Sequence, residues 1–234
     1  MIRHRLSRER GHFDHGWLDT YHSFSFGEYA DPRHDGFRSL RVLNEDRVAP
    51  GRGFGRHGHR DMEILTLVLE GALRHQDSLG SGSVITPGEI QRMTAGTGIL
   101  HSEANLSTTE PVHLIQIWII PDRTGYAPEY EERKVDYSEA SGRFKLLASP
   151  DGRDETVRVH QDVTLWLGQV SGEQVLHHEI APGRHAWVQV TRGAVRLEGK
   201  TLQAGDAAAL SEEPGVSLNA AEGGPAEVLL FDLA

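Results

Sequence analysis

The feature that most constrains the fold is an internal repeat of two strand-forming hairpins. The segment Thr66–Arg74 resembles Val188–Arg196, and each reads as a strand, a glycine turn and a second strand. Farther along, residues 85–89 resemble residues 202–206, and both segments end with a glycine followed by an acidic residue. Short runs rich in branched aliphatic residues and bounded by Gly, Pro, Asp or Ser favour strands. Two halves with a similar order of strands predict an all-β chain of two stacked antiparallel β-barrels.

The boundary between the two halves is expected in a polar stretch from about Arg133 to Gly142. A polar segment between two sets of apolar strands is typical of a linker. We therefore divide the chain into an N-terminal domain, residues 1–135, and a C-terminal domain, residues 136–234. The one segment in which we expect a short helix lies in this linker, around residues 138–142.

The two halves differ in a way that indicates a site in the first half alone. The tetrapeptide Ala49–Arg52 recurs as Ala181–Arg184. Twenty positions separate the glycine of the first tetrapeptide from the hairpin glycine of its half, and ten separate the pair in the second half. We infer that the second half has lost ten residues, which cover the His57–His59 segment. At a later turn, the first half has His101–Glu103 and the second has Val216–Leu218.

Composition narrows the range of partners and compartments. The net charge is −10, which disfavours direct binding to the phosphate backbone of a nucleic acid. The sequence has no cysteine, so disulfides and thiolate metal sites are excluded. No stretch approaches the ~20 apolar residues of a membrane helix, and the N-terminal residues lack the apolar run of a signal peptide. We expect a cytoplasmic protein without a membrane segment, and a monomer.

Two pairs of polar residues with the same spacing carry the chemistry. His57 and His59 are two residues apart, as are His101 and Glu103. On a strand, residues i and i+2 point to the same face, so each pair can direct two ligands at one ion. Three neutral imidazoles and a carboxylate suit Fe(II), Mn, Co, Ni, Cu or Zn, and they suit Ca or Mg poorly. The set predicts one divalent transition metal per chain, held in the first domain.

With these residues in view, the sequence resembles the pirin family over essentially its whole length. The segments that carry the resemblance are Gly11–Phe26, Gly53–Glu63, Glu70–Gly71, His75–Ser78, Pro87–Glu89, Met93–Glu103 and Val159–Asp162. The resemblance is strongest to bacterial pirin-like quercetin 2,3-dioxygenases. It implies a bicupin fold of jelly-roll type and metal ligands at His57, His59, His101 and Glu103. It implies iron, as Fe(II), as the expected metal.

Other polar residues are candidates for a supporting role. Glu63 follows His59 by four positions, as in the general cupin motif His-x-His-x3-Glu, in which the Glu is a ligand. The pirin pattern favours Glu103 instead, so we place Glu63 beside the ligands rather than on the metal. His75, with Asp77, could hold a ligand imidazole or cap a turn, and Gln116 could line the pocket. A structural role is expected for His22, His113, His160, His177, His178 and His185.

Three functions remain open from the sequence. The leading hypothesis is a dioxygenase that cleaves flavonols such as quercetin with O2 and releases carbon monoxide, with Glu103 as ligand and general base. The substrate in this hypothesis comes from the family resemblance. The alternative is a non-enzymatic, redox-sensing regulator that acts through a protein partner, as the animal member of the family is described. A third option is a zinc-dependent isomerase.

Overall fold

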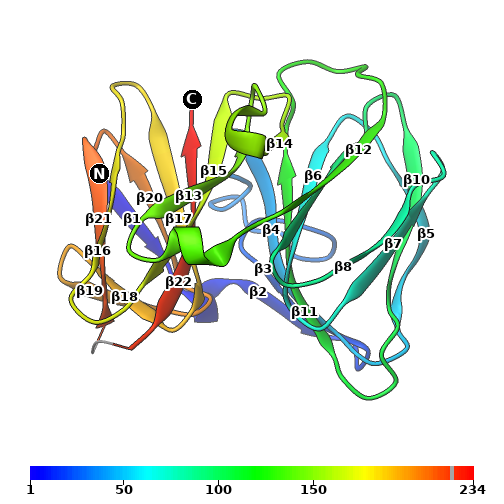
Figure 1. The fold of residues 1–234 in the computed structure, drawn as a ribbon, viewed down its shortest axis with the longest axis horizontal. Helices are drawn as coiled ribbons and strands as arrows, with labels where there is room; N and C mark the ends of the chain where they lie inside the picture. The colour runs from blue at the N-terminus through cyan, green and yellow to red at the C-terminus, as the bar shows by residue number, and fades with distance from the viewer. Residues whose placement is uncertain (222–223) are drawn as a thin grey trace. The chain divides into compact units, whose positions relative to one another are not determined.

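In the computed structural model, which describes residues 1–221 and 224–234, the chain consists almost entirely of β-strands joined by tight turns (Figure 1). The 3-10 helices η1 (Ser7–Glu9), η2 (Tyr137–Ala140) and η3 (Arg153–Glu155) are each a single turn. The second of these lies in the segment where the sequence predicted a short helix. None of the helices in the described part of the chain has the length and apolarity that a membrane crossing requires.

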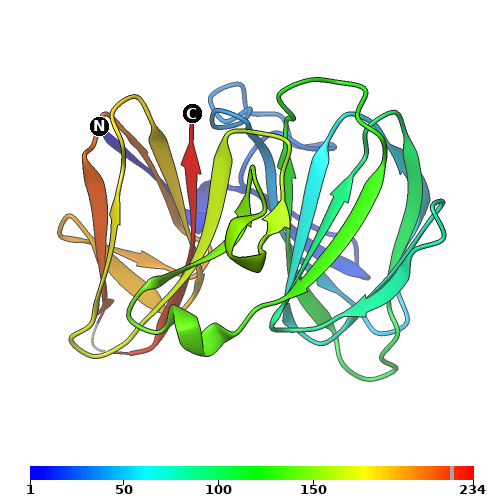
Figure 2. The same ribbon diagram turned by 45° about the horizontal axis from the view of Figure 1, so that its top comes forward.

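The chain divides into two compact units, whose strands can be followed by colour in Figure 2. The N-terminal unit comprises Gly11–Val135 and Val157–Gln161. The C-terminal unit comprises Met1–Arg10, Asp136–Thr156 and Asp162–Ala234. The chain passes from the N-terminal to the C-terminal unit after Val135, and residues 1–10 and 157–161 belong to the other unit than the residues that follow or precede them in sequence. The first ten residues join the C-terminal unit because β1 (Ile2–Arg5) pairs in antiparallel fashion with β20 (Ala207–Ser211).

The N-terminal unit contains two antiparallel sheets. The larger has the strand order β12 (Glu129–Lys134), β9 (Glu89–Thr94), β6 (Glu63–Glu70), β11 (Val112–Ile119), β4 (Leu40–Val48), β3 (Leu18–His22) and β2 (Gly11–Asp14). The smaller has the order β5 (Gly53–His59), β10 (Ile99–Asn105), β7 (Leu73–Asp77) and β8 (Gly82–Ile85). Val68 and Leu114 of the larger sheet pack in one buried cluster with Leu73 and Ile85 of the smaller. The alternation of side chains along each strand supplies this shared apolar core.

The C-terminal unit repeats this arrangement. Its larger sheet contains β1, β20, β17 (His185–Arg192), β22 (Ala226–Leu233), β15 (Val163–Val170) and β13 (Phe144–Ser149) in that order, and β14 (Val157–Arg158) belongs to the N-terminal unit. Its smaller sheet has the order β16 (Val175–Glu179), β21 (Gly215–Ala220), β18 (Ala194–Leu197) and β19 (Lys200–Gln203). The order β9-β6-β11-β4 thus recurs as β20-β17-β22-β15, and β5-β10-β7-β8 recurs as β16-β21-β18-β19. The chain is therefore all-β, with two domains of similar strand order, as the internal repeat predicted, and both are cupin-like, as the family resemblance implied.

The hairpin turn requires glycine in both halves for the same structural reason. Gly71 and Gly193 both have positive φ, +80° and +67°. A Cβ on Gly71 would lie 2.8 Å from the carbonyl oxygen of Pro111, and a Cβ on Gly193 would lie 2.2 Å from that of Pro225. Both turns therefore require glycine, because any side chain would meet backbone.

The inferred ten-residue loss was wrong, because the two Ala-Pro-Gly-Arg segments occupy different turns. Ala49–Arg52 lies between β4 and β5, whereas Ala181–Arg184 lies between β16 and β17. The strand equivalent to β5 is present in the second half as β16, and it precedes the tetrapeptide. Short turn sequences recur wherever a chain makes a similar turn, so they align less reliably than strand registers.

Candidate metal centre

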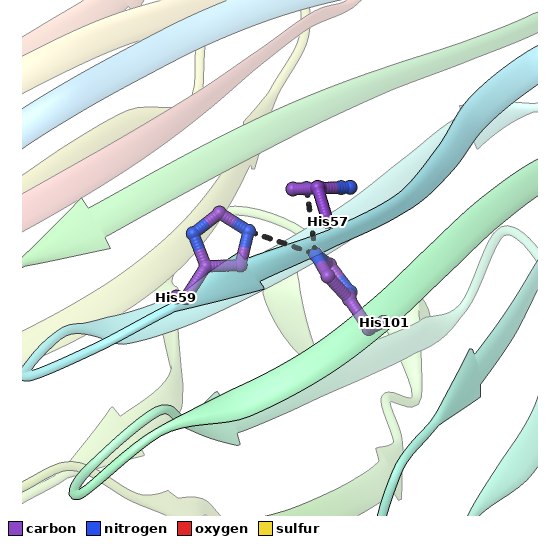
Figure 3. A group of neighbouring side chains, drawn as sticks. All are labelled: His57, His59 and His101. Carbon is purple, nitrogen blue, oxygen red and sulfur yellow. Dashed lines mark hydrogen bonds between the residues drawn. The ribbon is translucent and has the colours of Figure 1, made fainter.

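The three histidines singled out in the sequence converge on one point of the N-terminal unit. In the register of β10 with β5, His101 pairs with His57, and Ile99 pairs with His59. The Nε2 atom of His101 lies 2.8 Å from Nε2 of His59 and 3.0 Å from Nε2 of His57. Figure 3 shows the three rings, two from β5 and one from β10, turned toward one another. Two adjacent strands therefore aim three ring nitrogens at a common centre.

The spacing of these nitrogens fits a shared metal ion. With metal–nitrogen distances of ~2.0–2.1 Å, two ligands at right angles about an ion lie roughly 2.9 Å apart, and tetrahedral ligands lie roughly 3.3 Å apart. The observed separations of 2.8 and 3.0 Å are those of ligands at right angles. The donor set and these separations therefore fit a divalent transition metal.

Two imidazoles of this group, those of His59 and His101, favour the neutral form that binds metal. Burial, with the neighbouring His57, lowers the pKa of His59 to about 4. Burial and the adjacent histidines lower the pKa of His101 to about 3. His57 donates from Nδ1 to the carbonyl oxygen of Gly55 at 2.8 Å, which places its lone pair on Nε2, the atom that faces the centre. Neutral rings with Nε2 unprotonated need release no proton when they bind a metal ion.

Glu103 brings a carboxylate to the same region. A β-bulge between His101 and Glu103 shifts the register of β10 against β5. A carboxylate oxygen of Glu103 lies within 4.8 Å of ring nitrogens of His101 and His75. The amide Nε2 of Gln116 on β11 donates to Glu103 Oε2 at 3.0 Å, and Gln116 Oε1 accepts from Trp118 Nε1 at 3.2 Å. Burial raises the pKa of Glu103 to about 7, and the nearby Asp46 adds to the rise.

His75 lies behind His101, on the side away from the converging nitrogens. Its Nδ1 is 3.4 Å from Nδ1 of His101, and its Nε2 is 3.2 Å from Oδ2 of Asp77. The other oxygen of Asp77 accepts from the backbone N–H groups of Leu79 and Ser81 at 2.8 and 3.0 Å. His75 is fully buried, and the ring of Tyr130 stacks on it with centroids 4.9 Å apart. The turn after β7 thus anchors a carboxylate–imidazole pair against His101.

The metal centre opens into a cavity of about 580 Å³ within the N-terminal unit. Its aromatic lining consists of Phe13, Trp17, Phe26, Phe54 and Trp118. Two pairs of these rings make edge-to-face contacts. The centroids of Phe26 and Trp118 are 5.3 Å apart, and those of Trp17 and Phe54 are 5.4 Å apart. His57, His59 and Glu103 also line the cavity, so a planar aromatic molecule in it could reach these three side chains.

Glu63 lies in a different polar cluster. Its carboxylate accepts from Thr94 Oγ1 at 3.1 Å and lies 3.3 Å from Nδ1 of His160. Tyr126 packs against the His160 ring, with centroids 3.9 Å apart. Glu63 is completely buried, and this burial raises its pKa despite the nearby Arg92 and His160. The carboxylate therefore joins β6 to β9 and to the 157–161 segment.

Sequence reasoning missed two polar residues of the cavity, Asn44 and Asp46 on β4. Both line the cavity and are 3% and 4% exposed. Thr20 Oγ1 donates to Asp46 Oδ1, and burial raises the pKa of Asp46 to about 7. A usable signal was present, because two polar residues two apart interrupt the otherwise apolar face of a central strand.

The strand registers identify which residues of the C-terminal unit occupy the positions of the four candidate ligands. In β21, Val216 and Leu218 occupy the positions of His101 and Glu103, as the sequence comparison inferred. In β16, His178 pairs with Val216 as His57 pairs with His101, which places Ile180 at the position of His59. Ile180, Val216 and Leu218 are buried in the apolar core of that unit. His178 is directed instead to Asp232, at 2.8 Å. Substitution rather than deletion has removed three of the four donors.

Comparisons with known proteins match both halves of the chain. Residues 3–119 match the family model described as Pirin, and residues 146–233 match the model described as Quercetinase C-terminal cupin domain. A quercetin 2,3-dioxygenase of Escherichia coli strain K12 is 47% identical over 233 residues, which cover 100% of this chain and 99% of that protein.

Solved structures agree with these matches. The bacterial pirin YhhW of Escherichia coli, crystallised in complex with nickel(II), has a TM-score of 0.94 at 47% identity and covers 100% of this chain and 99% of its own. The YhaK protein of Escherichia coli has a TM-score of 0.74 at 30% identity and covers 95% of this chain and 97% of its own. The nickel complex is consistent with a divalent metal at the histidine centre described above.

Proposed function

The chain belongs to the pirin family, and on that premise we propose that it is a metal-dependent dioxygenase that opens flavonols such as quercetin with O2. In this reaction one flavonol and one O2 give the ring-opened ester and one molecule of carbon monoxide. The observation that carries the proposal is a group of three converging imidazoles, two of which line an aromatic-walled cavity together with the buried carboxylate of Glu103. The relatives named as quercetin 2,3-dioxygenases support the same substrate.

We propose that His57, His59, His101 and Glu103 hold the metal ion, with Fe(II) as the expected metal and nickel as its rival. The nickel complex of the Escherichia coli relative supports the rival. When bound, the ion supplies Lewis acidity, which favours the ionised form of a substrate hydroxyl coordinated to it.

Glu103 is the proposed proton acceptor for that hydroxyl. Gln116 donates to Oε2 and so fixes the orientation of the carboxyl group. Burial raises the pKa of Glu103 to about 7, so this carboxylate is a better proton acceptor than an exposed glutamate. In the proposed step, the O–H bond of the flavonol hydroxyl breaks and its proton passes to the Glu103 carboxylate.

We propose that His75 and Asp77 position His101. Asp77 can only accept, so Nε2 of His75 donates to it and Nδ1 of His75 is left as an acceptor. That acceptor faces Nδ1 of His101, which then carries the proton and leaves its Nε2 for the metal. This is the single tautomer assignment in which every nitrogen of the pair finds a complementary partner. Groups that hold the far nitrogen of a ligating histidine typically change metal affinity ~10–100-fold.

Glu63 is proposed as support at a greater distance. Its hydrogen bond with Thr94 and its contact with His160 hold β9 and the 157–161 segment against β6. Since β6 pairs with β11, which carries Gln116, the effect of Glu63 on the site is transmitted through the sheet. We expect its loss to weaken stability more than chemistry.

The aromatic walls would exclude water and hold the flavonol rings. Trp118 packs edge-on against the ligand His59, with centroids 4.8 Å apart, so the wall begins at the metal centre itself. A planar ligand between such rings gains both buried apolar area and favourable edge and face contacts. This arrangement fits a flat, aromatic substrate better than an aliphatic one.

The test is oxygen consumption with quercetin by protein loaded with Fe(II), Mn, Co, Ni or Cu. We expect uptake that stops after chelation and returns when the metal is restored, with carbon monoxide formed in equal amount. Absence of uptake with all five metals would refute the dioxygenase proposal. If the same protein still bound one of these metals, the metal centre would then have a non-catalytic role.

A further inference from the structure

The polar residues of the cavity form a stripe across three neighbouring strands. In the sheet register, Asn44 of β4 pairs with Gln116 of β11 on one side and with His22 of β3 on the other. One step along, Asp46 pairs with Thr20. All five side chains line the cavity. The stripe therefore starts at Gln116, which donates to Glu103, and continues away from the metal centre.

The stripe has acceptor capacity that the protein itself does not use. Asn44 is 3% exposed, and within the described residues its Oδ1 has no hydrogen-bond partner. Thr20 donates to Oδ1 of Asp46, which leaves the second carboxylate oxygen for a ligand. A buried acceptor without a partner costs free energy, so its persistence on a cavity wall points to a group that arrives with the ligand.

The C-terminal unit provides an internal comparison. Equivalent registers place Trp166 at the position of Asn44, Gly168 at that of Asp46 and Leu230 at that of Gln116. A Cβ on Gly168 would lie 2.7 Å from a Leu176 side-chain atom, so this space is already filled. The unit in which three of the four metal donors are replaced has also replaced the stripe. The polar stripe is therefore present in the unit that has the candidate metal donors and absent from the unit that shares only the fold.

We propose that Asn44 and Asp46 bind a hydroxyl group of the substrate that lies away from the metal, and so select flavonols that carry free hydroxyls outside the chelating pair. This inference rests on the proposed function and adds a determinant of specificity to it. A phenolic O–H donates to Asp46 or to Oδ1 of Asn44, while the aromatic walls hold the rings. A substrate without such a hydroxyl, or with it methylated, leaves both acceptors unsatisfied.

The test compares the binding of quercetin and 3-hydroxyflavone, which keeps the chelating hydroxyl and ketone but lacks the other hydroxyls. Binding is followed by quenching of tryptophan fluorescence, because Trp17 and Trp118 line the cavity. Zinc-loaded protein under nitrogen is used, so that nothing turns over. We expect the wild type to bind quercetin about 5–10-fold more tightly than 3-hydroxyflavone.

Asn44→Leu and Asp46→Leu should abolish this preference while they leave the affinity for 3-hydroxyflavone unchanged within about twofold. Thr20→Val combined with Asp46→Leu is the second variant, because it removes the donor that Asp46→Leu would leave unpaired. Asp19→Leu is the matched control: Asp19 is also on a strand of this sheet, but its side chain is 38% exposed and contacts His12. It should retain the wild-type preference.

Each result decides between the two proposals. Equal affinity of the wild type for both ligands, or an equal loss of both ligands in the variants, would overturn the specificity role and leave the proposed function intact. The wild-type comparison decides this even where a variant fails to fold. If neither quercetin nor 3-hydroxyflavone bound the wild type, the proposed function would be overturned, and the specificity role with it.

Discussion

Replacement of Asp77 by Asn tests the tautomer chain behind the metal centre with the smallest change in shape. Leu79 and Ser81 donate to Oδ1 of Asp77, so in the variant the amide oxygen takes that place and the amide NH2 faces His75. Nε2 of His75 then has to accept, and its proton moves to Nδ1. That proton points at Nδ1 of His101, 3.4 Å away. Two N–H groups cannot face each other favourably, so His101 loses the tautomer that leaves Nε2 for metal.

We expect Asp77→Asn to weaken metal binding by ~10–100-fold, or about 1.4–2.8 kcal/mol. The assay is competition for zinc or nickel against a chromophoric chelator, and circular dichroism reports whether the fold is retained. His75→Phe keeps the ring that stacks on Tyr130 but removes both nitrogens, and it should show a loss of similar size.

The matched control is Asp232→Asn in the C-terminal unit. His178 Nε2 lies 2.8 Å from Asp232 Oδ2, so this substitution also changes a carboxylate–imidazole contact. It does so in the unit where Ile180, Val216 and Leu218 stand at the positions of His59, His101 and Glu103. Metal affinity should not change in this control. Wild-type affinity in a folded Asp77→Asn protein would refute the tautomer argument.

Three further predictions follow from the site. Glu103→Gln should lower quercetin turnover more than Glu63→Gln, since the Glu63 carboxylate lies against Thr94 and His160; the reverse order of kcat/KM values would favour Glu63 as the metal ligand. His57→Ala combined with His59→Ala should abolish metal content in elemental analysis, and two equivalents of metal in the wild type would contradict a single site. Because burial raises the pKa of Glu103 to about 7, its carboxyl group is protonated below that pH, and zinc affinity should fall as the pH drops from 7 to 5. Glu103→Gln should show a smaller fall over the same range.

Much of the fold and the centre of the site could be read from the sequence because they depend on local periodicity. The hairpin repeat predicted two similar sets of strands, and the strand orders of the two units agree with it. The two-residue spacing of His57 and His59 needs nothing beyond the alternation of a strand to bring both rings to one face. The sequence also aligned His101 with Val216, and the strand registers agree with this alignment, although both residues lie on strands rather than at the turn that the sequence suggested.

Other features required the tertiary structure, because they depend on which strands become neighbours. The Ala-Pro-Gly-Arg repeat was misleading, since pairing rather than turn sequence shows that β16 is the counterpart of β5. The exchange of residues 1–10 into the C-terminal unit follows from the pairing of β1 with β20, more than 200 residues apart in the chain.

The contacts around the cavity are the clearest example of features that the sequence alone could not predict. Asn44 and Gln116 are far apart in sequence, and only the β4–β11 register brings them side by side next to Glu103. The contact of His75 with His101 likewise arises across the β7–β10 pair. A sequence specifies the chemistry of each side chain and the face of its own strand. The partners of that side chain, and hence its pKa, its tautomer and its access to a ligand, are decided by long-range pairing.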